Sequence, residues 1–245
     1  MKKLLAAIAI PLLLSSCQKN VETTQPASVS LKTSSTDVSK VEKNLNSDWQ
    51  TLIRKWNEWA YGRDASIAPF NDPDGSLQNL AQPFAQGVFM LAGGSSEDLV
   101  KRTVTIDLSQ YQYVFVPLVV LTVSLNPCDP DFGPKGGQPL EAFFRSQFKS
   151  AFNGPKELTL EWDGTSLLST KQKDARANSG VWTFNLHPTF SGCATTSAVY
   201  AEGFWAKIPL SLGTHTLTVG GNLHLKKKYD FEFSNIVEYT IVVVP

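Results

Sequence analysis

Residues 113–125 have the sequence YVFVPLVVLTVSL, in which valine, leucine and aromatic residues dominate. β-Branched and aromatic residues in such a run predict a long β-strand. Pro117 cannot donate a backbone hydrogen bond, so it indicates either a sheet edge or a β-bulge. A membrane helix needs about 20 apolar residues, and this run is interrupted by Pro117 and Thr122. We therefore expect it to form a strand rather than a membrane span.

Further strands are expected on both sides of this run. The segments are 87–91, 103–108, 158–162, 165–168, 181–186, 214–219, 223–233 and 236–244. Asp163-Gly164 predicts a tight hairpin turn between two of them. Many short strands separated by turn residues indicate a mainly β fold, a β-sandwich or jelly-roll-like domain.

Two accessory helices are expected beside the strands. The first begins at a capping box, residues 47–50, and continues with apolar residues at helical spacing until Gly62. It carries three tryptophans, Trp49, Trp56 and Trp59. We expect Trp49 and Trp56 to pack in the core, with a sugar-stacking platform as the alternative, whereas Trp59 lies about 60° off the apolar stripe. The second helix is expected at residues 139–152, which begin with proline.

The amino terminus, residues 1–16, has the features of an export signal. Lys2-Lys3 precede an apolar run at 4–14, and the sequence Leu14-Ser15-Ser16-Cys17 follows. Positive charge, a short apolar stretch and small residues before a cleavage site are typical of such signals. The arrangement resembles the signal peptide and lipobox of a bacterial lipoprotein, which implies cleavage before Cys17 and lipidation of that cysteine. A secretory signal with a free Cys17 and an uncleaved membrane helix are the alternatives.

Residues 17–46 are expected to form the lipidated cysteine and a flexible tether. After Cys17 this segment contains neither glycine nor aromatic residues and is rich in Ser, Thr, Lys and Val. As a flexible chain it reaches roughly 30 Å. Gln18, rather than aspartate, follows the cysteine, which in the lipoprotein family favours the outer membrane where an organism has two membranes. We expect a lipid-anchored protein of the cell envelope, with one β-rich domain at 47–245.

The other two cysteines are expected to pair. If Cys17 is lipidated, Cys128 and Cys193 remain, an even number in an oxidising compartment. A disulfide between them closes a loop of 65 residues, from 193 − 128, and contributes about 4 kcal/mol in the chain-entropy model. Two unrelated buried thiols are the alternative.

The composition indicates an ordinary folded domain with limited classes of partner. Hydrophobic residues make up 42% of the chain and aromatic residues 11%, enough for one sizeable core. The formal net charge is zero and Lys226–Lys228 is the only basic run, so no nucleic-acid partner is expected. The expected partners are the membrane, through the lipid, and a glycan or another envelope component.

Two acidic turns are the candidate cation sites. Asp72-Pro73-Asp74-Gly75 places two carboxylates two residues apart, and Asp129 and Asp131 form a similar loop. Calcium prefers several oxygen ligands from a turn, so calcium at Asp72 and Asp74 is the one cofactor that we consider. Because Asp, Pro and Gly also form turns unaided, a plain turn is the alternative, above all for the second loop.

No complete catalytic motif is present. The three histidines lack zinc-site spacing and no G-x-S-x-G sequence occurs. We therefore expect a non-catalytic binding or structural module. The alternative is an exported, glycosidase-like hydrolase with an acid/base pair drawn from separated acidic residues. The candidates for that pair are Glu161, Glu202, Asp72 and Asp74.

An ordered series of short motifs resembles an uncharacterised family of secreted bacterial proteins. The motifs are the Trp-rich helix 49–59, the turn 72–75, strands at 86–93, 102–106 and 114–118, and then 202–205, 209–210, 213–215 and 239–242. The resemblance covers most of residues 45–244. It implies a shared fold and export, and it transfers no catalytic residue.

Overall fold

The computed structural model describes residues 47–83, 86–94, 99–125, 131–148, 157–168, 176–192, 195–224 and 232–245. All of these lie in one compact unit, Thr36–Pro245. The expected signal peptide, Cys17 and all of the expected tether lie outside the described residues, as do Cys128 and Cys193. Lipidation and the disulfide therefore stay predictions.

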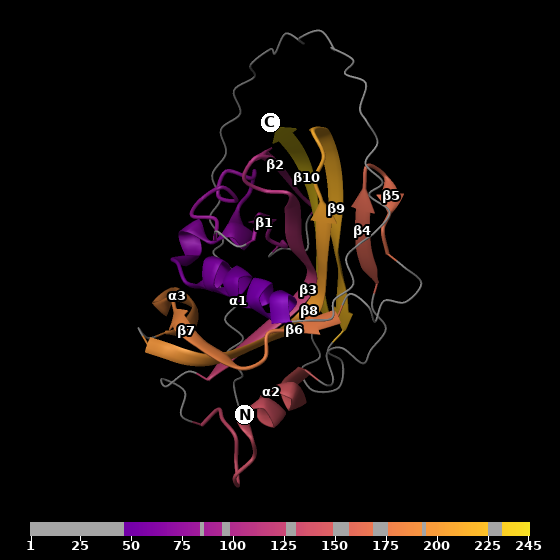
Figure 1. Ribbon diagram of the computed structural model, residues 1–245. Helices are drawn as coiled ribbons and strands as arrows, with labels where there is room; N and C mark the ends of the chain where they lie inside the picture. The colour runs from indigo at the N-terminus through magenta and orange to yellow at the C-terminus, as the bar shows by residue number, and fades with distance from the viewer. Residues whose placement is uncertain are drawn as a thin grey trace, which may run out of the picture. The chain divides into compact units, whose positions relative to one another are not determined.

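Within these ranges the chain forms two five-stranded sheets, and the fold is mainly β, as expected (Figure 1). The first sheet has the order β1-β3-β8-β6, and β7 also pairs with β8. Its strands are β1 (Val88–Met90), β3 (Tyr113–Leu125), β6 (Arg176–Asn178), β7 (Trp182–Leu186) and β8 (Thr195–Pro209). The second sheet has the order β2-β10-β9-β4-β5. Its strands are β2 (Val100–Asp107), β4 (Leu158–Trp162), β5 (Thr165–Ser166), β9 (Gly213–His224) and β10 (Glu232–Val244).

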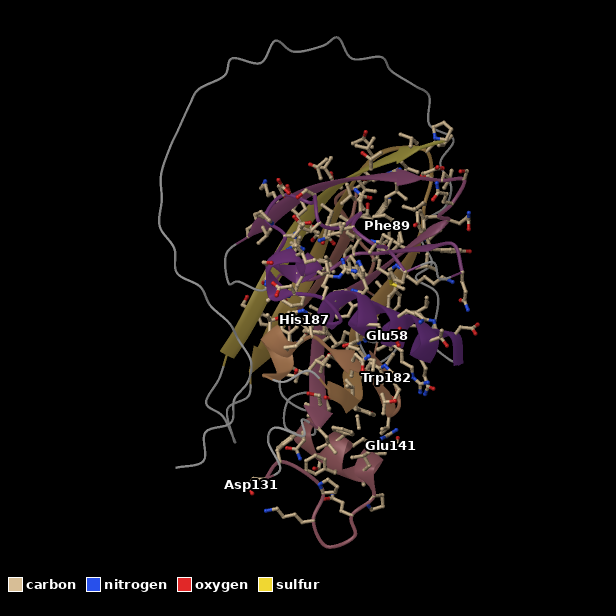
Figure 2. The ribbon with its side chains drawn as sticks, turned by 90° about the vertical axis from the view of Figure 1, so that its left-hand side faces the viewer. Glu58, Phe89, Asp131, Glu141, Trp182 and His187 are labelled. Carbon is tan, nitrogen blue, oxygen red and sulfur yellow. The ribbon has the colours of Figure 1, made fainter. Side chains whose placement is uncertain are left out.

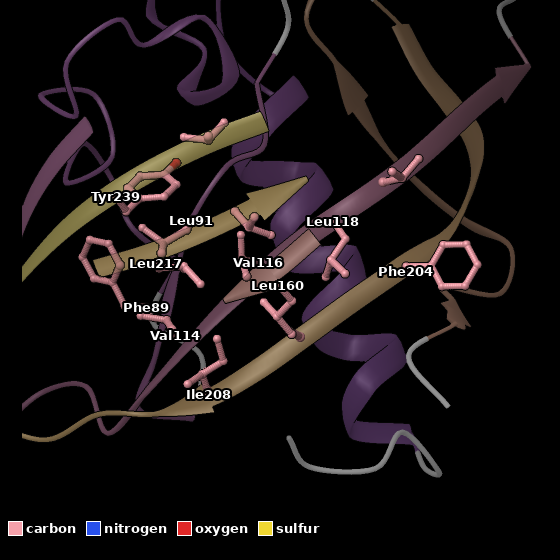
Figure 3. Packing of buried hydrophobic residues seen from close by; sticks show 14 of the residues in the cluster. Phe89, Leu91, Val114, Val116, Leu118, Leu160, Phe204, Ile208, Leu217 and Tyr239 are labelled. Carbon is pink, nitrogen blue, oxygen red and sulfur yellow. The ribbon is translucent and has the colours of Figure 1, made fainter. Parts of the chain in front are cut away.

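The sandwich core lies between the two sheets (Figure 3). Alternate residues of each strand point inward, as the burial of every second residue of β2 illustrates. The buried residues shown include Phe89 and Leu91, Val114, Val116 and Leu118 of β3, and Leu217 and Tyr239 of the second sheet. Together they give a mainly β sandwich with accessory helices.

A second apolar cluster lies on the outer face of the first sheet, beneath helix α1 (Ser47–Tyr61). It contains Trp49, Trp56 and Trp59 from the helix, together with residues of β1, β3 and β8. All three tryptophans are buried. The expected core packing of Trp49 and Trp56 is thus confirmed, and Trp59 joins them.

The remaining helices are short. Helix α2 (Leu140–Phe148) begins one residue after the expected start and buries Phe143, Phe144 and Phe148; residues 149–152 of the expected helix lie outside the described ranges. Helix α3 (Pro188–Ser191) and two 3-10 turns, Ala65–Ile67 and Pro69–Asn71, complete the described helical structure. No helix in the part of the chain that the structure describes is long and apolar enough to cross a membrane.

The strand prediction was wrong at β6, at β8, at β9 and over the segment 223–233. β8, with 15 residues, and the short β6 were not expected as strands. β9 continues without a break through residue 219, where the first of two predicted strands ended, to His224. The predicted strand 223–233 is not one strand, because residues 223–224 end β9 whereas residues 232–233 begin β10 and pair with them in antiparallel fashion. At Pro117, the register with β8 shifts between Pro117 and Val119. The expected irregularity at Pro117 is confirmed there. β1 pairs with β3 only at residues 113–115, so among the described strands Pro117 lies where β3 pairs with β8 alone.

Candidate functional site

The turn at Asp72 holds a buried carboxylate whose oxygens already have partners. Asp72 is only 1% exposed. Its Oδ1 accepts the backbone N–H groups of Asp74 at 3.2 Å and Gly75 at 2.9 Å. Its Oδ2 accepts those of Leu77 at 2.9 Å and Gln78 at 3.0 Å, and the Gln78 side chain at 3.0 Å. The carboxylate therefore caps the turn without needing a cation to satisfy it.

The second candidate ligand of this turn, Asp74, faces solvent. Its Oδ1 accepts the backbone N–H of Ser76 at 2.9 Å, and this bond is the main reason that its pKa is lowered. Asp131, the described residue of the other acidic loop, is exposed beside α2 (Figure 2). Within the described ranges, no group of three or more His, Cys, Asp or Glu side chains is arranged to hold a metal ion. Calcium at Asp72 and Asp74 stays a prediction.

We expect Asp72→Asn to destabilise the protein even without calcium. The asparagine NH₂ group would face the backbone donors that the carboxylate now accepts, and the lost charge-assisted bonds correspond to about 1.5–3 kcal/mol. Asp74→Asn, at the exposed position, is the matched control and should cost less than about 1 kcal/mol. Urea unfolding in EDTA and in millimolar calcium measures both. A calcium-dependent rise in wild-type stability that Asp72→Asn removes would establish a calcium site instead.

A buried arginine connects this turn to the sandwich. Arg102 of β2 is 2% exposed, and among the described residues its guanidinium donates to neutral oxygens. These are the backbone oxygens of Asp72 (2.7 Å), Phe70 (3.0 Å), Ala92 (3.2 Å) and Gly93 (3.2 Å), and the hydroxyl of Tyr239 (2.8 Å). The Tyr239 hydroxyl in turn donates to the Ala92 oxygen at 2.6 Å. Burial raises the pKa of Tyr239 to about 12. Every group in this network has a partner, so its role is structural.

Glu202, on β8, is paired rather than poised for acid/base chemistry. Its Oε1 accepts Nε of Arg176 at 2.7 Å and Nη2 at 2.6 Å. Its Oε2 accepts the hydroxyl of Tyr200 at 3.2 Å. Burial, and then the negative charge of Glu202, raise the pKa of Tyr200.

The four acidic residues expected for a hydrolase lie on three separate elements. Asp72 and Asp74 are in the turn, Glu161 is exposed on β4, and Glu202 is on β8. Among the described residues, no hydrogen bond or ion pair joins the two turn residues to Glu161 or Glu202, or Glu161 to Glu202. The positions of these four residues therefore do not support the expected acid/base pair.

One group with catalytic residue types was not expected from the sequence. His215, at the start of β9, has Nδ1 2.9 Å from Oδ2 of Asp163 and Nε2 3.2 Å from Oγ of Ser211. Asp163 is 52 residues away from His215 in the sequence. Only the pairing of β4 with β9, in which Trp162 lies opposite Leu217, brings them together. The sequence Asp163-Gly164 predicted the hairpin turn. It did not reveal the register between β4 and β9 that places this turn beside His215.

Comparisons with known proteins assign no family. No family model matches the chain, and no curated protein matches it. Among solved structures, a cysteine protease inhibitor from Entamoeba histolytica is similar over 64% of this chain and 95% of its own, with 11% identity and a TM-score of 0.20. A likeness at that TM-score carries no argument about function.

Proposed function

We propose that this is a lipid-anchored protein of the cell envelope whose β-sandwich serves as a binding or structural module. The observation that carries the proposal is Leu14-Ser15-Ser16-Cys17, which follows Lys2-Lys3 and the apolar run 4–14. Gln18 favours the outer membrane where the organism has two. The expected partners are the membrane, through the lipid, and a glycan or another envelope component.

The contacts of the folded part are compatible with such a module. Asp72 caps a turn and Glu202 pairs with Arg176, so two of the four candidate acids have structural partners. The anchor itself needs no protein surface, because each buried methylene contributes about 0.8 kcal/mol and a lipoprotein cysteine carries several acyl chains. Attachment should therefore be effectively permanent.

Replacing Cys17 by alanine is expected to move the protein from the membrane fraction to the soluble fraction. The variant lacks the thiol that accepts the lipid, so labelling with a radioactive or clickable fatty acid should also disappear. Ser16→Ala, which keeps a small residue before the cysteine, is the matched control and should remain anchored and labelled. Persistent membrane binding and labelling of Cys17→Ala would show that the lipoprotein interpretation is wrong.

A further inference from the structure

The β4–β5 turn holds the carboxylate of Asp163 in a fixed position over β9. Asp163 and Gly164 have φ values of 49° and 74°, which match a type I′ hairpin turn. The Asp163 N–H donates to the oxygen of Thr216 at 2.8 Å, and Oδ1 accepts the Thr216 N–H at 2.8 Å. This reciprocal pair leaves Oδ2 directed at Nδ1 of His215, 2.9 Å away.

The imidazole of His215 is held in one orientation by contacts at both of its ring nitrogens. Its side chain is 9% exposed, and its ring lies 5.0 Å from that of Trp162 with a tilt of 30°. Because a carboxylate only accepts, the hydrogen bond to Asp163 places the proton of a neutral imidazole on Nδ1. The free lone pair is then on Nε2, which faces the hydroxyl of Ser211 at 3.2 Å.

The site also has a partner for the ring once it has taken up a proton. Nε2 lies 3.1 Å from the backbone oxygen of Ser211, which accepts an N–H from a protonated ring. The Asp163 carboxylate then faces the positive charge from the other side. The two acceptors therefore stabilise the imidazolium that forms when a serine hydroxyl loses its proton.

We propose that Ser211 and His215 form a nucleophilic site for hydrolysis of carboxylic esters, with Asp163 as the positioning residue. This activity goes beyond the proposed envelope module and does not depend on the lipid anchor. Ser211 is partly exposed, and Leu212 beside it is 47% exposed, an apolar contact for a small acyl group. The site lies at the end of the sandwich where β10 finishes, because Gly213 pairs with Val243 (Figure 1).

The reaction balances with water as the second reactant. Oγ of Ser211 bonds to the acyl carbon as its proton moves to Nε2 of His215, and that proton leaves with the alcohol when the ester C–O bond breaks. Water then attacks the acyl-serine, giving its proton to Nε2. Cleavage of the serine ester returns that proton to Oγ and releases the carboxylic acid.

The test uses the full-length lipoprotein in detergent, with a fluorophosphonate probe and p-nitrophenyl acetate. We expect the wild type to be labelled at Ser211 and to hydrolyse the ester, and Ser211→Ala to lose both. His215→Gln should slow both by about 10²-fold or more, because the general base is lost. Ser109→Ala, at an exposed serine hydrogen-bonded to Asp107, is the matched control and should behave as wild type.

Circular dichroism confirms that each variant is folded, so loss of labelling reports chemistry. An unlabelled wild type, labelling that maps to another residue, or full labelling of folded Ser211→Ala would overturn the proposal. These outcomes are independent of membrane fractionation, which tests only the anchor through Cys17→Ala. The proposal of an esterase site and the proposal of a lipoprotein can therefore be refuted independently of each other.

Discussion

Replacing Arg102 by methionine should lower the free energy of unfolding by about 3 kcal/mol or more. Methionine fills much of the same volume but donates no hydrogen bond, so the backbone oxygens of Asp72 and Phe70 lose the donors that they have in the structure. Each buried acceptor without a partner costs about 1–3 kcal/mol. Tyr239 loses its contact with the guanidinium as well. Urea unfolding monitored by circular dichroism measures the change.

The neighbouring residue provides a matched control for this variant. Lys101 is on the same strand but points to solvent, and its ion pair with Glu238 is exposed, with side-chain exposures of 67% and 33%. Lys101→Met should therefore change stability by less than about 1 kcal/mol. Arg102→Lys keeps the charge with fewer donors and should fall between the two. A stability of Arg102→Met equal to that of Lys101→Met would show that the network contributes little.

The predicted strand 103–108 did not include Arg102, and it is the structure that shows this residue pointing inward. Val104 and Ile106 alternate with exposed threonines, so Arg102 falls on the inward side of the same strand. A charged residue at an inward position is expected only where partners exist. Most of its partners are backbone oxygens, in the turn about 30 residues earlier and at Ala92 and Gly93. Every residue has a backbone oxygen, so the order of side chains in the sequence does not indicate which oxygens will accept a hydrogen bond from Arg102. The buried network was therefore not predictable from the residues alone.

β3, which was predicted well, and β8, which was missed, differ in what they pack against. β3 was expected at the bounds that it has, because its large apolar residues give a strong strand signal. β8 lies between β3 and β6, and its residues Ala201 and Trp205 belong to the cluster beneath α1. A Cβ atom at Gly203 would lie 2.3 Å from the oxygen of Val119. Close packing against β3 thus requires glycine at position 203, and glycine weakens the strand signal of the sequence around it.

The same reasoning explains the continuous β9. Gly220-Gly221 was not included in a predicted strand, since glycine usually marks a turn or an interruption. In the structure, a Cβ atom at Gly220 would lie 2.0 Å from the oxygen of Asn235 on β10. The glycines are needed for close approach of two paired strands. Long-range contacts of this kind also position His215 and Asp163, which is why that site escaped the sequence analysis.

Trp56→Ala should cost about 3–5 kcal/mol of stability, the range for loss of a buried tryptophan side chain. Trp56 of α1 is 2% exposed. Its ring packs edge-on against that of Trp205, with 5.3 Å between the ring centroids and 78° between the ring planes. Its Nε1 also donates to the backbone oxygen of Leu91 at 2.8 Å, joining the helix to the end of β1. The variant therefore loses apolar contacts and leaves a carbonyl without its indole donor.

Trp56→Phe separates these two contributions. Phenylalanine keeps an aromatic ring in the cluster and removes the N–H donor and part of the volume, so its cost should be smaller, about 1–2 kcal/mol. Chemical unfolding followed by circular dichroism gives both values. Equal losses for the two variants would mean that the hydrogen bond to Leu91 dominates. Negligible losses for both would show that α1 is not an integral part of the core, which the burial of all three helix tryptophans argues against.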